Sequence, residues 1–171
     1  IQISPDTDND YYDAASGYKY NHMTLMGFSL THLSGTGIPD LGDFLFIPGT
    51  GTKKFIPGTH DTPDEGYRSR YSHERECASA NYYGVDLLDY NVKAEMTSAM
   101  RSGIFRFTFP QSDSTFVMVD MDHVQWFKTA WSQLRIENDS VISGSKLVNG
   151  WGPERYVYFV AKFSKPFRNS G

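Results

Sequence analysis

The sequence predicts an all-β fold, an antiparallel β-sandwich with long loops in its N-terminal half. Three observations lead to this class. Aromatic and β-branched residues recur in short alternating runs, as they do in strands. Gly, Pro, Asn and Asp bound these runs, and no long segment of helical period competes with them. Many short strands without intervening helices indicate a sandwich or a barrel, and we favour the sandwich.

The C-terminal half contains the clearest strands. Tyr82–Leu88 and Val92–Thr97 predict a hairpin that turns at residues 89–91. Phe105, Phe107 and Phe109 alternate with other side chains, so their rings share one face of a strand that Pro110 ends. Further strands are predicted at Thr115–Met121, Trp131–Ile136, Val141–Val148 and Tyr156–Phe163, with a turn at residues 138–140.

The N-terminal half differs in composition. Gly, Pro, Thr and Asp are dense from Ser34 to Tyr67, and apolar residues come in brief bursts such as Phe44–Ile47. We therefore expect the first eighty or so residues to form loops that connect a few strands. Long loops in a compact domain are often functional.

Length and charge limit the function classes. The chain has 171 residues, enough for one hydrophobic core, so we predict a single domain over residues 1–171. Sixteen basic and twenty acidic residues give a net charge of −4 without a basic cluster, which argues against nucleic-acid binding. No apolar run approaches the roughly 18 residues that cross a bilayer, so no membrane-spanning segment is predicted. The single cysteine, Cys77, excludes an internal disulfide.

Metal-binding and catalytic motifs are incomplete. Asp6, Asp8 and Asp10 have the spacing that begins a calcium loop. Tyr11 replaces the required glycine and Gly17 the required glutamate, so we predict a solvated acidic loop. The five histidines show no pairing at metal-ligand spacing, and the residues support no metal site.

Nucleophilic catalysis has no sequence support either. The residue two positions before Ser34 is not the glycine of a nucleophile elbow. Linear spacing also nominates no facing pair of carboxylates for glycoside hydrolysis. We therefore assign no catalytic residue to this chain.

The segment from Thr31 to Asp43 is the best candidate for ligand contact. Its glycines permit close backbone approach, and its short polar groups suit a hydroxyl-rich ligand. The alternative is that the glycines serve turns and the polar groups bond to backbone, which composition alone favours. The candidate residues for substrate or interface contact are Thr31, His32, Ser34, Gly35, Thr36, Gly37, Asp40 and Asp43.

This segment also carries a resemblance to a known family. The stretch from Gly27 to Gly51, GFSLTHLSGTGIPDLGDFLFIPGTG, resembles the signature of the N-terminal domain of glycoside hydrolase family 92. Leu30 departs from it, since the family often has histidine there. Other blocks fit in order along almost the whole chain, namely SPDT (Ser4–Thr7), YRSRYSHE (Tyr67–Glu74), KAEMT (Lys93–Thr97), RFTFP (Arg106–Pro110) and YFVAKFSKPF (Tyr158–Phe167).

The resemblance implies the N-terminal β-sandwich domain of an exo-acting, inverting, calcium-dependent α-mannosidase that hydrolyses terminal α-linked mannose. It implies opening strands before Ile1 and, after Gly171, a C-terminal helical catalytic domain. That domain would carry the glutamate acid, the aspartate base and most calcium ligands. The implied partners are the helical domain and a mannose-containing glycan, and the implied location is the periplasm, the cell surface or the exterior of a bacterium. The parent protein is thus expected to be a glycosidase, and this chain alone to be inactive.

Two other functions remain open. The chain could be a non-catalytic carbohydrate-binding module, with tyrosines and Trp126, Trp131 and Trp151 as stacking platforms. Core packing is the expected role of most of these rings. It could also be a purely structural support for a helical partner domain. Glycan binding by the isolated chain would favour the module, and absence of both binding and hydrolysis would favour the support.

Overall fold

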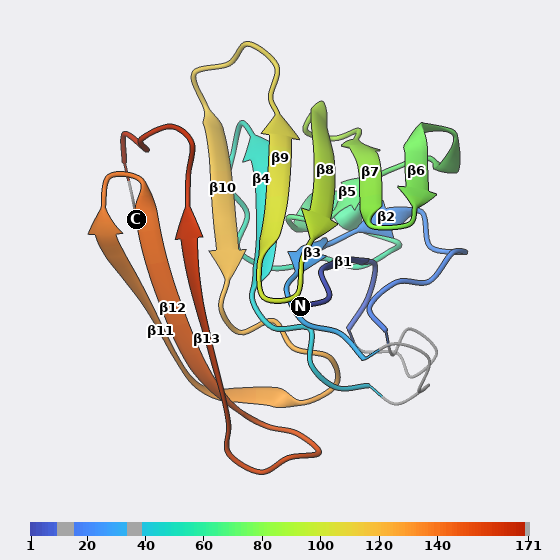
Figure 1. Ribbon diagram of the computed structural model, residues 1–171. Helices are drawn as coiled ribbons and strands as arrows, with labels where there is room; N and C mark the ends of the chain where they lie inside the picture. The colour runs from blue at the N-terminus through green and yellow to red at the C-terminus, as the bar shows by residue number, and fades with distance from the viewer. Residues whose placement is uncertain (10–15, 34–38, 170–171) are drawn as a thin grey trace.

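The computed structural model describes residues 1–9, 16–33 and 39–169, and the regular structure in these ranges is almost entirely strand (Figure 1). The first antiparallel sheet has the order β1-β3-β4-β10 and the second the order β6-β7-β8-β9. The third has the order β11-β12-β13, and β2 pairs with β5. The strand bounds are β1 (Ser4–Asp6), β2 (Thr24–Leu25), β3 (Gly27–Ser29), β4 (Leu45–Thr50), β5 (Ser69–Arg70), β6 (Glu76–Ser79), β7 (Tyr82–Leu87), β8 (Val92–Ser98), β9 (Gly103–Thr108), β10 (Thr115–Asp120), β11 (Lys128–Asn138), β12 (Val141–Asn149) and β13 (Arg155–Lys162).

The predicted β-sandwich is confirmed, as are the predicted strands of the C-terminal half. β7 and β8 form the expected hairpin, and Asn91 in its turn has a φ of 52°, which asparagine tolerates better than most residues. β11 is longer than predicted, because it continues through two register shifts to Asn138. The N-terminal half contains only short strands, joined by long connections and two 3-10 turns, η2 (Pro63–Glu65) and η3 (His73–Arg75).

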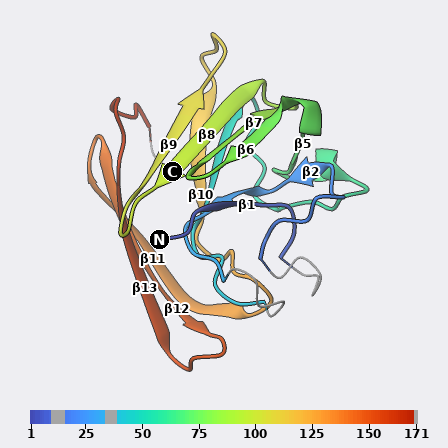
Figure 2. The same ribbon diagram turned by 45° about the vertical axis from the view of Figure 1, so that its right-hand side comes forward.

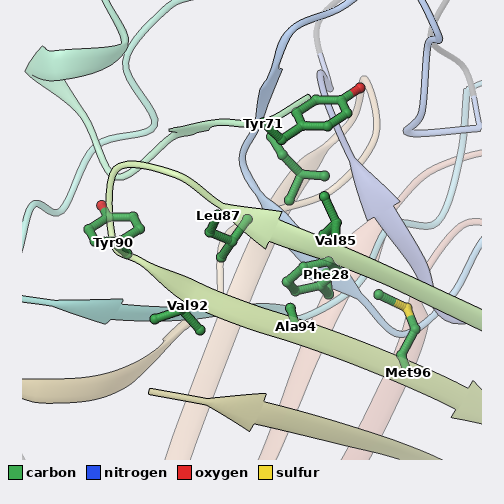
Figure 3. Close-up of a cluster of buried hydrophobic side chains, with 9 residues drawn as sticks. Phe28, Tyr71, Val85, Leu87, Tyr90, Val92, Ala94 and Met96 are labelled. Carbon is green, nitrogen blue, oxygen red and sulfur yellow. The ribbon is translucent and has the colours of Figure 1, made fainter. Parts of the chain in front are cut away.

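The main hydrophobic core lies between the first two sheets. Phe28 of β3 is fully buried against apolar side chains of β7 and β8, as Figure 3 shows. The Phe105 and Phe107 rings of β9 lie 6.3 and 6.1 Å from the Phe28 ring, between centroids. The face of β9 that was predicted to carry these phenyl rings therefore packs against the first sheet.

The first sheet is covered on its second face as well. Leu45 and Ile47 of β4 are buried there against Met26 and Tyr67. The Tyr67 hydroxyl donates a hydrogen bond of 2.7 Å to Asp120 at the end of β10. Because both faces are covered, the consecutive β4 residues 45–49 are all buried and the sequence of the strand does not alternate.

The third sheet continues the architecture at one side. Phe159 of β13 packs on Phe44 and Phe46, with ring centroids 4.6 and 5.6 Å apart. Figures 1 and 2 show this sheet beside β10, with the β12–β13 turn projecting past the ends of the other strands. In the described part of the chain, no helix is long and apolar enough to span a membrane.

Candidate functional site

The segment from Thr31 to Asp43, which we call the signature segment, rests on a buried carboxylate. Asp6 of β1 is completely buried and lies 2.6 Å from Nε2 of His32 and 2.6 Å from Nε2 of His123, one histidine on each oxygen. His32 follows β3 and His123 follows β10. The prediction of a solvated acidic loop was wrong for Asp6 and for Asp8, which is 4% exposed, because histidine partners compensate the burial of both carboxylates.

The charges of this cluster follow from its hydrogen bonds. Nδ1 of His32 lies 3.1 Å from the carbonyl oxygen of Gln2, while Nε2 faces Asp6. A carbonyl and a carboxylate can only accept, so both ring nitrogens donate and His32 is an imidazolium. Burial disfavours that charge, but Asp6 outweighs it and raises the pKa of His32. Burial likewise acts to raise the pKa of Asp6, yet His32 and His123 together hold it well below its usual range.

A second buried carboxylate holds the other end of the signature segment. The Thr31 hydroxyl donates to Oδ2 of Asp43 at 2.6 Å, and Nη1 of Arg155 donates to the same oxygen at 2.5 Å. Lys146 Nζ lies 3.2 Å from Oδ1 of Asp43 and donates to the carbonyl of His123 at 2.5 Å. The cations come from β12 and β13, so the third sheet anchors the segment electrostatically.

The backbone between these anchors is strained. Leu41 and Phe44 have φ values of 70° and 60°, which bulky residues rarely adopt, and Trp126 nearby has 66°. Gly42, with φ of 74°, could not be replaced without strain, since a Cβ there would come within 2.8 Å of the Gln125 side chain. Such residues cost on the order of 1–3 kcal/mol each and cluster at functional sites.

Two exposed indoles flank this strained backbone. The Trp151 amide, in the β12–β13 turn, lies 3.3 Å from Oδ2 of Asp40, and its side chain is 67% exposed. Trp126 is 55% exposed, and the amide of the preceding residue, Gln125, donates to the carbonyl of Leu41 at 2.8 Å. The expectation of core packing is therefore wrong for these two rings, whose exposed surfaces could stack on a sugar.

The structure assigns anchoring roles to the predicted site residues that it describes. Thr31 and Asp43 bond to each other, His32 bonds to Asp6, and Asp40 accepts from Nη2 of Arg155 at 3.3 Å. Ser34, Gly35, Thr36 and Gly37 lie outside the described residues.

The anchoring partners were missed by sequence reasoning. They are Asp6, His123, Lys146 and Arg155. Only Asp6 had a signal, since it belongs to the SPDT block. A lysine and an arginine on alternating strands look like ordinary surface residues until the fold buries them.

The chemistry open to this region is binding and orientation. Asp40 and Asp43 are both paired with cations. Burial acts to raise the pKa of Asp43, but Lys146, Thr31 and Arg155 lower it below its ordinary value, which is the opposite of what a general acid requires. Two shallow hollows of about 400 and 250 Å³ lie elsewhere, and none of the residues lining them belongs to the signature segment. The described residues that approach one another closely enough to share a metal are Asp8, His22 and His60, which also lie outside this segment.

Comparison with known proteins places this geometry in context. The sequence profile described as the glycosyl hydrolase family 92 N-terminal domain matches residues 1–171. The solved structure of the family GH92 α-mannosidase BT3965 from Bacteroides thetaiotaomicron is 71% identical, with a TM-score of 0.96 over 98% of this chain. A structure of the same mannosidase in complex with mannoimidazole matches equally well. This chain spans only 23% and 22% of the length of those two chains. Comparison with curated proteins gave no match.

Proposed function

This chain is a glycosyl hydrolase family 92 N-terminal domain, and we propose that it forms one wall of the sugar pocket of an α-mannosidase. The parent enzyme would be exo-acting and inverting, and would release terminal α-linked mannose from glycans. The mannosidase from Bacteroides thetaiotaomicron, whose structure was also solved with mannoimidazole, supports this substrate class. We propose a periplasmic, cell-surface or secreted location in a bacterium, as the family resemblance implies.

The observation that carries the proposal is the built platform around Asp40. Two buried carboxylates and their four cationic or imidazole partners fix the ends of the signature segment. Exposed Trp126 and Trp151 lie beside the strained backbone between those ends. A sugar-binding wall requires rigid support beneath its exposed aromatic rings. Sugars stack on indole rings, and ordering a mobile ring on binding would cost free energy.

The catalytic residues would come from the rest of the parent chain. The signature segment positions the sugar, and a helical catalytic domain would supply the glutamate acid and the aspartate base. Calcium would also be held mainly outside this chain. Calcium requires several oxygen ligands, and the carboxylates of the signature segment, Asp40 and Asp43, are already paired with Arg155 and Lys146. These residues therefore do not fit a calcium ion.

The surface that would pack on the remaining chain is the outer face of the third sheet. Cross-strand pairing places Trp131, Leu147, Tyr156, Tyr158 and Val160 on that face. Trp131 and Tyr156 are about half exposed, and Tyr158 and Val160 are 71% and 74% exposed. Contiguous exposed apolar residues mark interaction surfaces, and more than three quarters of the similar mannosidase lies outside the match. We propose that this remaining polypeptide covers the face.

Substitution of Trp151 in the full-length enzyme tests the pocket wall. We expect Trp151→Ala to lower kcat/KM for an α-mannoside about 10-fold, because a sugar–indole stack contributes roughly 1 kcal/mol or somewhat more. Trp151→Phe should retain most of the wild-type kcat/KM. Phe55→Ala is the matched control, since Phe55 is 75% exposed but follows the far end of β4. If Trp126→Ala and Trp151→Ala both leave kcat/KM unchanged, the wall does not contact substrate.

One observation favours a second candidate, a carbohydrate-binding module that acts without hydrolysis. Trp126, Trp131 and Trp151 are all at least 48% exposed, as stacking platforms must be. Trp131, however, lies on the outer face of the third sheet, away from the signature segment. Glycan binding by this chain alone separates the two candidates.

A further inference from the structure

Three potential metal ligands from two connections converge beside β1 and β2. Asp8 follows β1, His22 precedes β2, and His60 lies between β4 and η2. One ligand atom from each lies within 4.8 Å of the other two. Nε2 of His60 is 2.9 Å from Oδ2 of Asp8, and the two imidazole centroids are 3.9 Å apart. Small side-chain movements would therefore bring all three around one ion.

Threonine hydroxyls orient both rings. Nδ1 of His22 lies 3.1 Å from Oγ1 of Thr7, and Nδ1 of His60 lies 2.8 Å from Oγ1 of Thr24. Metal-binding histidines usually engage one ring nitrogen in such a hydrogen bond, which fixes the tautomer and directs the other nitrogen to the metal. Nε2 of each ring is thus the atom that would bind the ion.

The ligand types select the ion. Two imidazoles and one carboxylate suit Zn²⁺, whereas Ca²⁺ and Mg²⁺ take mainly oxygen ligands. We propose that Asp8, His22 and His60 form a zinc site in which water completes a tetrahedron. The three proposed ligands are not among the residues of the proposed sugar wall, so the zinc site does not depend on the proposed function.

The electrostatic surroundings of the proposed site set its affinity for zinc. Asp8 supplies a buried negative charge, while Nη1 of Arg68 lies 3.5 Å from both ring nitrogens of His60. The same arginine repels a divalent ion, so we expect affinity weaker than that of structural zinc fingers. The ion would tie the β1–β2 connection to the β4–η2 connection and stabilise the N-terminal half.

Zinc titration of the full-length enzyme, first stripped of metal and then saturated with calcium, tests this site. The calcium keeps zinc from occupying the calcium ligands. We expect calorimetry to show that zinc binds and that this binding requires both histidines. The midpoint of thermal unfolding should rise with zinc concentration. His22→Ala and His60→Ala should each weaken this binding about 100-fold, since ligand loss costs at least as much as loss of an outer-shell partner. His22 is half-buried and its removal should leave the fold intact, which circular dichroism would verify.

His73→Ala is the matched control. His73 also contacts a carboxylate, with Nδ1 2.6 Å from Glu76, but no third ligand joins that pair among the described residues. Zinc affinity in this variant should equal that of the wild type. Absence of a zinc-dependent midpoint shift would overturn the proposal. So would binding that His22→Ala and His60→Ala leave unchanged, or that His73→Ala weakens equally.

Discussion

At the scale of single residues, Asp43 shows how one buried charge organises the signature segment. It accepts hydrogen bonds from Thr31 and Arg155, and Lys146 lies beside its second oxygen. Both Asp43 and Lys146 are completely buried. Removal of either partner of such a pair leaves an uncompensated charge, which costs far more than the net contribution of the intact pair.

Asp43→Asn should lower the free energy of unfolding by about 3 kcal/mol at pH 7, because Lys146 then remains charged and unpaired in the interior. Chemical denaturation followed by tryptophan fluorescence would measure the change. Asp64→Asn is the control. Asp64 pairs with Arg70 at the surface, where solvent screens the contact and its contribution to stability is small. Equal effects of the two substitutions would contradict the structural role of Asp43.

The same residue predicts a pH dependence. Burial opposes the charge of Asp43, but Lys146, Thr31 and Arg155 lower its pKa below the ordinary value. A carboxyl group with a lowered folded pKa contributes stability above its unfolded pKa of about 4, and that stability is lost as the pH falls toward the folded value. Unfolding free energy measured from pH 7 to pH 3 should therefore fall less steeply in Asp43→Asn than in the wild type.

At the scale of elements, the third sheet has two different faces. Its inner face carries Lys146, Arg155 and Phe159 toward the signature segment and the first sheet. Its outer face presents exposed aromatic and aliphatic side chains. One sheet therefore both anchors the proposed pocket wall and offers a surface for the remaining polypeptide, which would couple the wall to its neighbouring domain.

Tyr158→Asp should distinguish a covered face from a free one. We expect the full-length enzyme to lose about 2 kcal/mol or more of unfolding free energy, because a charge replaces a buried aromatic ring. This chain alone should lose less than about 0.5 kcal/mol, as at other exposed positions. Met100→Asp, at an 86% exposed residue in the β8–β9 turn, is the control for both proteins. Equal effects of Tyr158→Asp in the two proteins would show that the outer face is not covered.

At the scale of the whole molecule, we predict that this chain alone releases no mannose. The carboxylates of the signature segment are paired with cations, and the proposed acid and base belong to another domain. An assay of the purified chain with an α-mannoside would test this, after circular dichroism has verified that the chain is folded. Release of mannose, with contamination excluded, would contradict the proposed division of roles.

The sequence alone determined the fold class, most strands of the C-terminal half and the family resemblance. Alternating side chains such as Phe105 and Phe107 predict a strand with one buried face, because that pattern is local. The signature from Gly27 to Gly51 indicated the family because its residues are consecutive, and the profile match confirmed it.

Only the tertiary structure decided which polar residues work together. His123 reaches Asp6 across 117 residues, and Arg155 reaches Asp43 across 112. Asp8 and His22 of the β1–β2 connection likewise converge with His60 of the β4–η2 connection, at positions that follow no spacing rule. The burial that makes these contacts strong arises when the sheets pack, so neither the partners nor the altered pKa values can be deduced from neighbours in the chain. The sequence therefore determined where the strands lie, and packing decided which charges they bury.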